Sequence, residues 1–372
     1  MVITMPQSDA YPDLGGRTRA PDAPLLEVKE LSVAFHTRDG VVRAVNNVSF
    51  SLKRGERLAI VGESGSGKSV MSMALMQMIA RGGAIDHGEV VLNGRNLLAL
   101  STNELRHVRG NEVAMVFQDP STSLNPIMSV HDQITPPLKQ HLKLSDTEAR
   151  TRAIELLTAT GIPDPARNID AFPHQLSGGM RQRVMIAIAI SCNPDLLIAD
   201  EPTTALDVTI QAQIVALLRR ISEEQNSSVV FVTHDMGLVA RFADRVAVMY
   251  AGRIVETGPV RDLFADPQHP YTRGLLGSIP SIEGVLPKRL TQISGAPPNL
   301  AMLGPGCAFA PRCPQLMGRC EEVRPDLELL RPQHLAACWA AVGEEEDLAS
   351  PDYARSPSTT LLGTPNGASH VR

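Results

Sequence analysis

The apolar residues of the chain fall into short runs that predict alternating strands and helices. Six runs have the length and residue types of strands. They lie at residues 26–33, 41–50, 58–61, 196–199, 229–233 and 246–250. The spacing in the second half also predicts a helix at about 208–225 and a short helix between the last two strands. Strands that alternate with helices indicate crossover connections, so we expect an α/β fold with a largely parallel sheet.

Helix signals are also clear in the middle of the chain. Ser145 and Glu148 have the spacing of a capping box, which opens a helix that Gly161 can close.

The densest apolar run, Val184–Ile190, has seven residues. A membrane-spanning helix needs roughly 18. We therefore expect that this chain does not cross a bilayer by itself.

Composition narrows the class of protein. The chain has 372 residues, of which 43% are hydrophobic and 20% charged, as in ordinary globular proteins. Its length predicts two domains, or one large domain with an appendage. The net charge of −5 gives no general attraction to nucleic acid or anionic lipid. Aromatic residues make up 3% of the chain while 14 residues are Met, which predicts an aliphatic, sulfur-rich core.

Changes in composition divide the chain into four segments. Residues 1–23 are interpreted as a flexible leader without the apolar core of a signal peptide. We therefore expect the protein to be located in the reducing cytoplasm. Residues 24–263 carry the strand and helix pattern. Residues 264–342 are interpreted as a small irregular module, because nine prolines and four cysteines crowd its 280–340 part. Residues 343–372 have the acidic and then Ser/Pro/Thr/Gly-rich composition of a disordered tail.

A glycine-rich motif follows the strand at 58–61. Residues 62–69 read GESGSGKS and match G-x-x-x-x-G-K-[ST]. Glycines let successive backbone N–H groups surround phosphate oxygens, and the helix that follows presents its positive end to the same anion. Lys68 supplies a cation for the phosphates and Ser69 a hydroxyl for Mg²⁺. A glycine-rich turn with an exposed lysine is the alternative, and the placement between strand and helix argues against it.

Two further motifs point to the same chemistry. Asp200 and Glu201 end an apolar strand, where the first can hold Mg²⁺ and the second can activate a water molecule. Ser177 is a natural N-cap, and Gly178 and Gly179 expose the amides of the helix behind it, which gives a second anion-binding helix start. Each motif alone has an ordinary structural explanation, but together with the glycine-rich loop they are specific.

In order and spacing, these motifs resemble the ATP-binding subunit of ABC transporters over about residues 25–260. The set also includes Gln118 in VFQDP, LSGGM at 176–180, Asp207 after Ala205-Leu206, and His234 in VTHD. The resemblance implies a P-loop ATPase domain over 24–263 with a helical subdomain at about 119–176. It further implies that two such subunits close head to tail, with ATP held between the glycine loop of one and the LSGGM helix of the other.

The resemblance also assigns roles to residues. Glu201 would polarise the attacking water, His234 would contact the γ-phosphate and orient that water, and Gln118 would sense Mg²⁺ and γ-phosphate. Ser69, Gln118 and Asp200 are the expected Mg²⁺ ligands. Phe35 is the candidate for stacking on adenine, although it could simply belong to the core. The expected nucleotide contacts are Phe35, Gly62, Ser64, Gly65, Ser66, Gly67, Lys68, Ser69, Val70, Gln118, Asp200, Ser177, Gly178, Gly179 and Asp207.

Position 180 departs from the family pattern. The signature usually ends in Gln, and this chain has Met180. The amides and Ser177 remain, so the expected phosphate contacts are kept, but any contribution from a Gln side chain is absent.

Wider strings, among them FPHQLSGGMRQRV and HPYTRGLL, resemble the dipeptide and oligopeptide importer branch, most closely its dipeptide D-type ATPase subunit. In that branch the carboxyl module carries cysteines that ligate an iron–sulfur cluster. Four thiols in a proline-rich segment suggest a module held together by metal. Their spacing lacks the C-x2-C pairs of structural zinc sites, which favours a [4Fe–4S] cluster over zinc or unliganded thiols. The expected ligands are Cys307, Cys313, Cys320 and Cys338.

The sequence therefore predicts an ATPase that powers peptide import from the cytoplasmic face of the inner membrane. The resemblance implies two transmembrane permease subunits, a homologous ATPase partner and an extracytoplasmic substrate-binding protein, with no nucleic acid. Alternatives are an importer for nickel chelate or haem, a soluble ABC ATPase acting on ribosomes or DNA, and a regulator without turnover. The presence of both Glu201 and His234 argues against the last.

Overall fold

The computed structural model describes residues 23–37, 40–204, 206–279 and 293–342. The predicted leader, apart from residue 23, and the predicted tail lie outside these residues, as does Ala205. None of the helices described in these ranges is both long and apolar enough to cross a membrane.

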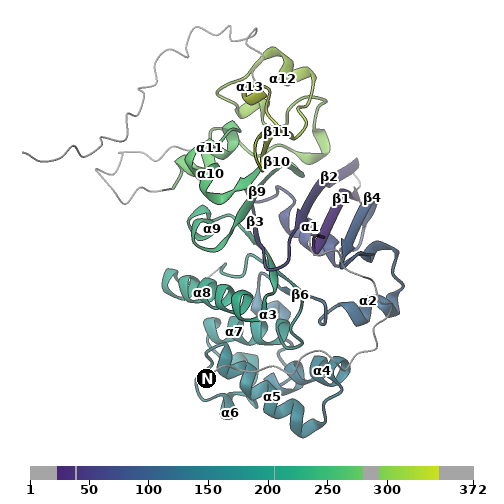
Figure 1. Ribbon diagram of the computed structural model, residues 1–372, viewed down its shortest axis with the longest axis vertical. Coiled ribbons are helices and arrows are strands. Elements are labelled where there is room, and N and C mark those ends of the chain that lie inside the picture. The colour runs from purple at the N-terminus through teal and green to yellow at the C-terminus, as the bar shows by residue number, and fades with distance from the viewer. Residues whose placement is uncertain (1–22, 38–39, 205, 280–292, 343–372) are drawn as a thin grey trace, which may run out of the picture.

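A mixed sheet forms the centre of the molecule (Figure 1). Its strands run in the order β11-β12-β10-β9-β3-β8-β7-β6. The strands from β9 to β6 pair in parallel, and β10, β12 and β11 continue the sheet antiparallel. The bounds are β3 Arg57–Val61, β6 Val113–Val116, β7 Leu196–Asp200, β8 Ser228–Thr233, β9 Arg245–Tyr250, β10 Arg253–Pro259, β11 Glu328–Arg331 and β12 His334–Ala336.

A second, smaller sheet is antiparallel throughout. It has the order β2-β1-β4-β5 and the bounds β1 Leu26–Thr37, β2 Gly40–Leu52, β4 Gly83–Leu92 and β5 Arg95–Asn96. The six predicted strands and the α/β class are confirmed. The prediction of a largely parallel sheet is right for the centre of the large sheet and wrong for this one, because hairpin-like neighbours such as β1 and β2 pair antiparallel.

Helices cover the sheets and form a separate group beyond β6 (Figure 1). Those near the sheets are α1 Lys68–Leu75, α2 Thr102–Val108, α8 Val208–Gln225, α9 Met236–Phe242, α10 Val260–Ala265 and α11 Pro270–Gly277. The group beyond β6 comprises α3 Pro120–Ser123, α4 Val130–Leu142, α5 Asp146–Ala159, α6 Pro165–Asn168 and α7 Gly178–Ala189. Two short helices, α12 Gly318–Glu322 and α13 Trp339–Val342, belong to the carboxyl region.

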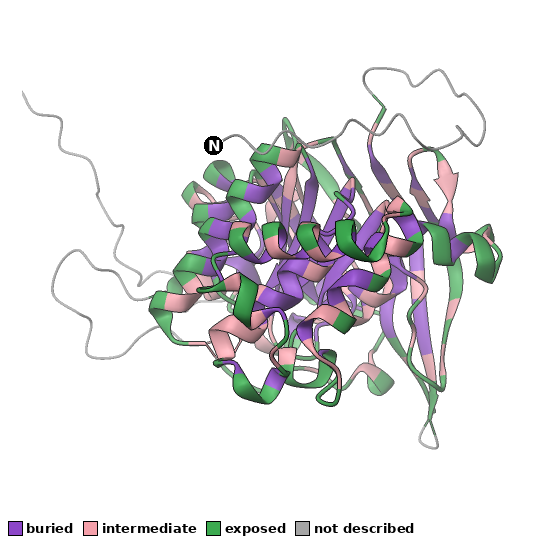
Figure 2. Ribbon diagram, turned by 90° about the horizontal axis from the view of Figure 1, so that it is seen from below, coloured by how far each residue is buried: buried purple, intermediate pink, exposed green. Residues whose placement is uncertain are grey.

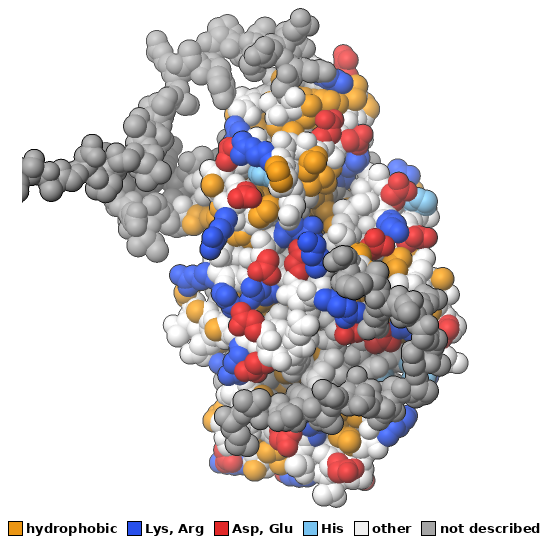
Figure 3. Space-filling view, in the orientation of Figure 1, with side chains coloured by type: hydrophobic (Ala, Val, Ile, Leu, Met, Phe, Trp, Pro, Cys, Tyr) orange, Lys and Arg blue, Asp and Glu red, His pale blue; other side chains and the backbone are white. Residues whose placement is uncertain are grey.

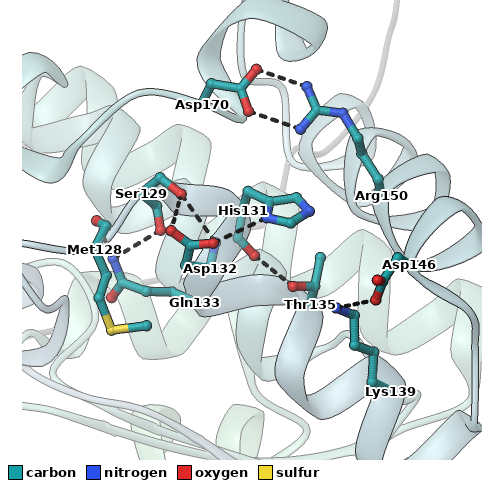
Figure 4. A network of polar contacts seen from close by, with 10 residues as sticks. All are labelled: Met128, Ser129, His131, Asp132, Gln133, Thr135, Lys139, Asp146, Arg150 and Asp170. Atoms are coloured by element: carbon teal, nitrogen blue, oxygen red, sulfur yellow. Dashed lines mark hydrogen bonds and ion pairs between the residues drawn. The ribbon is translucent and has the colours of Figure 1, made fainter.

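Polar contacts fix the start of α5 and tie this helix to a neighbouring loop. The predicted capping box is present, since Ser145 N–H donates to Glu148 at 2.9 Å and the Ser145 hydroxyl accepts from the Glu148 N–H at 3.4 Å. Gly161, with φ of 77°, follows the end of α5 as predicted. Arg150 on α5 donates to both carboxylate oxygens of Asp170, at 2.8 and 2.7 Å, which ties this helix to the loop before the LSGGM segment (Figure 4).

Four apolar clusters form the core of the described residues, and Figure 2 shows buried positions concentrated in the interior of the molecule. The first joins the helical group to the sheet, and the second lies between the two sheets and α1. The third joins β9 and β10 to the carboxyl region. The fourth is small and lies within the carboxyl region, where it comprises Ala310, Met317 and Cys320. On the face seen in Figure 3, basic and acidic side chains are interspersed over the described surface.

The carboxyl region has more apolar core than its composition predicts. Tyr271 and Phe309 are 0% and 2% exposed, and they pack with Tyr250 of β9 at ring-centroid distances of 4.5 and 5.3 Å. The carboxyl region therefore contains buried aromatic packing that its proline-rich composition did not indicate, and its interpretation as a small irregular module stays a prediction. The sequence does not indicate this core, because the aromatic residues that form it lie far apart along the chain. The boundary predicted at 263/264 falls inside α10, and the domain division stays a prediction.

Candidate nucleotide site

The carboxyl ends of four neighbouring parallel strands meet at one edge of the large sheet. The glycine-rich loop follows β3, His234 follows β8, Asp200 ends β7, and Gln118 follows β6. Loops at this edge of a parallel sheet are the usual place for ligands in α/β proteins. The structure thus gathers these sequence-predicted residues because β6, β7, β8 and β3 are adjacent.

The loop between β3 and α1 has the backbone of a phosphate cradle. Gly67 has φ of 102°, and a Cβ there would lie 2.1 Å from the carbonyl oxygen of Ala44, so no other residue fits. The Lys68 ammonium donates to the carbonyl oxygens of Gly62 and Glu63 at 2.8 and 2.9 Å. Burial lowers the pKa of Lys68, while nearby carboxylates act in the opposite direction. The Lys68 ammonium is therefore already in position to bind an anion in the loop.

Ser69 and Asp200 form a second contact across this edge. The Ser69 hydroxyl donates to Asp200 Oδ1 at 3.1 Å. Burial raises the pKa of Asp200 to about 6, with the Ser69 hydrogen bond acting the other way. A buried carboxylate next to a hydroxyl is a donor set suited to Mg²⁺.

Glu201 lies at the centre of a polar group. Gln118 Nε2 donates to Glu201 Oε2 at 2.9 Å, and His234 Nδ1 lies 3.5 Å from Glu201 Oε1. The Thr204 hydroxyl also donates to Glu201 Oε2, at 3.0 Å. Glu201 has φ of 44°, a conformation uncommon outside glycine. Sequence reasoning missed Thr204, although it lies only three residues beyond Glu201.

A further contact that the sequence did not indicate comes from the carboxyl region. Arg312 pairs with Glu63, the second residue of the glycine-rich loop, at 2.7 Å. The two residues are 249 positions apart. Local patterns carry no signal for such a contact.

The LSGGM segment lies at the start of α7, in the helical group beyond β6. Ser177 caps α7 by accepting from the Met180 N–H at 3.3 Å, as predicted, and Gly178 and Gly179 form the first turn. Helix α7 packs against α3, α4, α5 and β6, whereas α1 packs against both sheets. Asp207 caps α8 in the same way, accepting from the Ile210 N–H at 2.9 Å. These caps satisfy helix amides at the starts of α7 and α8, where Gly178 and Gly179 lie close to Leu206 and Ile210.

Phe35 lies on β1 and is half-buried. Its ring packs directly on Gly83 of β4, where a Cβ would come within 2.6 Å of the ring, and it borders the core cluster between the sheets. The ring thus contacts the core between the sheets, and its role in stacking on adenine stays a prediction.

The four clustered cysteines are free thiols in one small region. Cys320 and Cys338 are buried, and the Cys307 N–H donates to the Cys320 carbonyl oxygen at 2.7 Å. Burial raises the pKa of Cys313 to about 11. Among the residues that the structure describes, no group of three or more His, Cys, Asp or Glu side chains is arranged to hold a metal ion. The geometry of the described residues thus gives no support to a zinc site or to the expected iron–sulfur cluster.

Comparisons with known proteins agree with the geometry of the site. The ABC transporter family model matches residues 45–204, and the model for the oligopeptide/dipeptide transporter C-terminal region matches residues 255–320. The oligopeptide transport ATP-binding protein OppD of Bacillus subtilis (strain 168) is 49% identical over 91% of this chain and 95% of the relative. The dipeptide transport ATP-binding protein DppD of Lactococcus lactis subsp. cremoris (strain MG1363) is 52% identical over 85% of this chain and 90% of the relative.

Among solved structures, a dimeric ATP-binding cassette in a post-hydrolysis state bound to ADP and Pi is 31% identical, with a TM-score of 0.58. The match covers 63% of this chain and 99% of that one. The family matches, the relatives and the phosphate cradle beside Glu201 lead to one conclusion: the chain is an ATP-hydrolysing member of the ABC transporter family, in its oligopeptide/dipeptide transporter branch.

Proposed function

We propose that the chain is the ATP-hydrolysing subunit of a peptide importer and that its nucleotide site lies at the edge formed by β3, β8, β7 and β6. The observation that carries the site is the convergence of Lys68, Ser69 and Asp200 with the group around Glu201. In this proposal the amides of Gly62, Ser64, Gly65, Ser66, Gly67, Lys68, Ser69 and Val70 surround the phosphates.

Three side chains would hold the metal of the nucleotide. The Ser69 hydroxyl, the Asp200 carboxylate and the Gln118 amide oxygen are oxygen donors, which Mg²⁺ prefers. When bound, Mg²⁺ neutralises charge on the phosphate oxygens. A carboxyl whose pKa is raised to about 6 is still largely ionised at neutral pH, so Asp200 remains a competent ligand.

Glu201 would act as the general base. Its carboxylate oxygens are held by Gln118, Thr204 and His234, which fixes the orientation that proton abstraction from water requires. His234 is 62% exposed at its side chain, so it can turn toward a γ-phosphate. Adenine stacking on Phe35 is also part of the proposal, supported by the position of β1 beside α1.

A second ATPase chain would complete the site. Ser177, Gly178, Gly179 and Asp207 lie at the starts of α7 and α8 and not in the loop between β3 and α1, so they suit the nucleotide of a partner in a head-to-tail dimer. The similarity to a dimeric ATP-binding cassette supports this arrangement. The names of the relatives, oligopeptide and dipeptide transport ATP-binding proteins, support a peptide as cargo. The proposal adds two membrane permease subunits, a homologous ATPase and an extracytoplasmic substrate-binding protein. In such a complex the chain would lie at the cytoplasmic face of the membrane.

The transport proposal predicts a specific set of partners and a loss of uptake. Affinity purification of the tagged chain from detergent-solubilised membranes should recover two multi-spanning proteins and a homologous ATPase. Deleting the gene should abolish uptake of labelled dipeptides or oligopeptides and leave free amino-acid uptake unchanged as a control. Recovery of ribosomal or DNA-repair proteins instead, or unchanged peptide uptake, would contradict the proposal.

We also propose that the four carboxyl-region cysteines hold a [4Fe–4S] cluster. The support is that the Cys307 N–H donates to the Cys320 carbonyl oxygen, that both of these side chains border one small apolar cluster, and that the Gln315 N–H donates to the Cys313 sulfur at 3.4 Å. Each thiolate would bind a different iron, so the ligands need not converge on one point as they do for a single ion. When bound, the cluster would cross-link four points of a loop-rich segment.

Chemical analysis checks the cluster directly. After anaerobic purification, iron and acid-labile sulfide should each be found at about four per chain. A Cys313→Ser variant should lose most of both, whereas Cys192→Ser, at a buried site outside the group, should keep them. Wild-type protein purified in this way without iron and sulfide would contradict the cluster.

A further inference from the structure

The phosphate loop is clamped by an arginine from the carboxyl region. Arg312 donates to Glu63 Oε2 at 2.7 Å and to Oε1 at 2.9 Å, a two-point contact of guanidinium with carboxylate. The Arg312 side chain is 6% exposed and that of Glu63 is 25% exposed. Arg312 also donates to the Tyr250 hydroxyl at 3.3 Å and to the Ser294 carbonyl oxygen at 2.9 Å. The guanidinium is therefore fixed on all sides.

The backbone of Glu63 is held as firmly as its side chain. Its N–H donates to the Tyr271 hydroxyl at 2.7 Å, and its carbonyl oxygen accepts from the Lys68 ammonium at 2.9 Å. Tyr271 belongs to α11 and is fully buried. A pocket on this side of the loop is walled by Pro297, Pro298 and Leu300. The carboxyl region thus builds one whole side of the loop.

The charge of Glu63 matters for ATP because of its place in the loop. Its carbonyl oxygen contacts the ammonium of Lys68, the loop's own phosphate-binding cation, and its carboxylate opposes the burial that lowers the pKa of Lys68. An uncompensated carboxylate in this position would repel the triphosphate, which carries several negative charges. Arg312 supplies the opposite charge at contact distance and so removes most of that repulsion.

We infer that Arg312 is a positioning residue for ATP, which sets nucleotide affinity by neutralising and orienting Glu63 of the phosphate loop. The inference rests on the proposed role of the Gly62–Ser69 loop as the phosphate site. It gives the carboxyl region a direct part in nucleotide binding and not only a structural one. Because Arg312 immediately precedes Cys313, rearrangement of the cysteine segment would reach the loop through a single side chain.

A double-mutant cycle in the assembled transporter tests the inference. The variants are Arg312→Gln, Glu63→Gln and the two combined, with Kd for ATP measured by nucleotide titration and KM and kcat by phosphate release. Arg312→Gln should weaken ATP binding about tenfold, with kcat within about twofold of the wild type. Glu63→Gln should bind ATP at least as tightly as the wild type. Arg312→Lys, which keeps the charge, should lose at most about twofold.

Rescue separates the charge effect from a loss of structure. The combined variant lacks the same ion pair as Arg312→Gln, yet it should return to within about twofold of wild-type affinity because the repelling carboxylate is gone. The defect of Arg312→Gln should also shrink at high salt. Unchanged affinity in Arg312→Gln, or a combined variant as weak as Arg312→Gln, overturns the inference.

A separate control tests the phosphate site itself. Lys68→Ala should abolish ATP binding whatever residue is at position 312. If Lys68→Ala bound ATP normally, the proposed loop would be wrong. If it lost binding while Arg312→Gln did not, the inference alone would fail.

Discussion

Replacing Glu201 with glutamine is expected to lower ATP turnover in the assembled transporter by about 10²- to 10⁴-fold while ATP binding is kept. Glutamine has the same shape and can still contact Gln118 and Thr204, but it cannot accept the proton of an attacking water. The loss should therefore appear in kcat and not in the Kd for ATP. Phosphate release under saturating ATP and a nucleotide titration measure the two quantities.

A matched substitution controls for the change of charge. Glu224→Gln removes one carboxylate from the exposed surface of α8, where Glu224 lies 4.0 Å from Arg220, and should leave turnover unchanged. Turnover of the Glu201→Gln variant within about threefold of the wild type would rule out Glu201 as the base. Loss of ATP binding in that variant would show that Glu201 acts in holding the nucleotide.

Replacing Phe309 with alanine is expected to destabilise the ATPase core and the carboxyl region together, by about 3–5 kcal/mol. Phe309 is 2% exposed, and its ring packs on Tyr250 of β9, Tyr271 of α11 and His269. Removing it leaves a cavity between the large sheet and the segment that follows it. Urea unfolding of the full chain measures the loss as a lower transition midpoint.

Two probes show whether the ATPase core and the carboxyl region unfold in one transition. The single tryptophan, Trp339, lies in the carboxyl region, where its indole N–H donates to the Val323 carbonyl oxygen at 2.9 Å. Its fluorescence should change in the same transition as far-UV circular dichroism, and Phe309→Ala should shift both. Phe172→Ala, at a ring that is 38% exposed, should shift neither appreciably. Separate transitions, with only the fluorescence shifted, would instead indicate an independent appendage.

A buried polar contact joins the same two regions. Glu256 of β10 is fully buried and lies 2.7 Å from His334 Nε2 of β12, and it also accepts from the Gln268 and His269 N–H groups at 2.7 and 2.9 Å. The carboxyl region is therefore attached by paired strands, tilted and edge-on aromatic contacts, and a buried carboxylate that accepts hydrogen bonds. Attachment of this kind suits a segment that holds the phosphate loop.

The sequence by itself determined what depends on neighbours along the chain. The glycine-rich loop, the Ser145 capping box and the strand that ends at Asp200 are local patterns, because backbone conformation and capping involve residues a few positions apart. The order and spacing of the motifs were enough to identify the family. The resemblance that these motifs carry also implied that Glu201 and Gln118 belong to one site, and the structure shows them in contact.

Only the tertiary structure decided which distant segments touch. The antiparallel second sheet, the addition of β11 and β12 to the main sheet, and the packing of Phe309 on Tyr250 all depend on long-range pairing. The contact of Arg312 with Glu63 spans 249 positions, and no periodicity or motif encodes such a distance. Such contacts form because burial of apolar area and pairing of charges are optimised over the whole chain, which local sequence does not reveal.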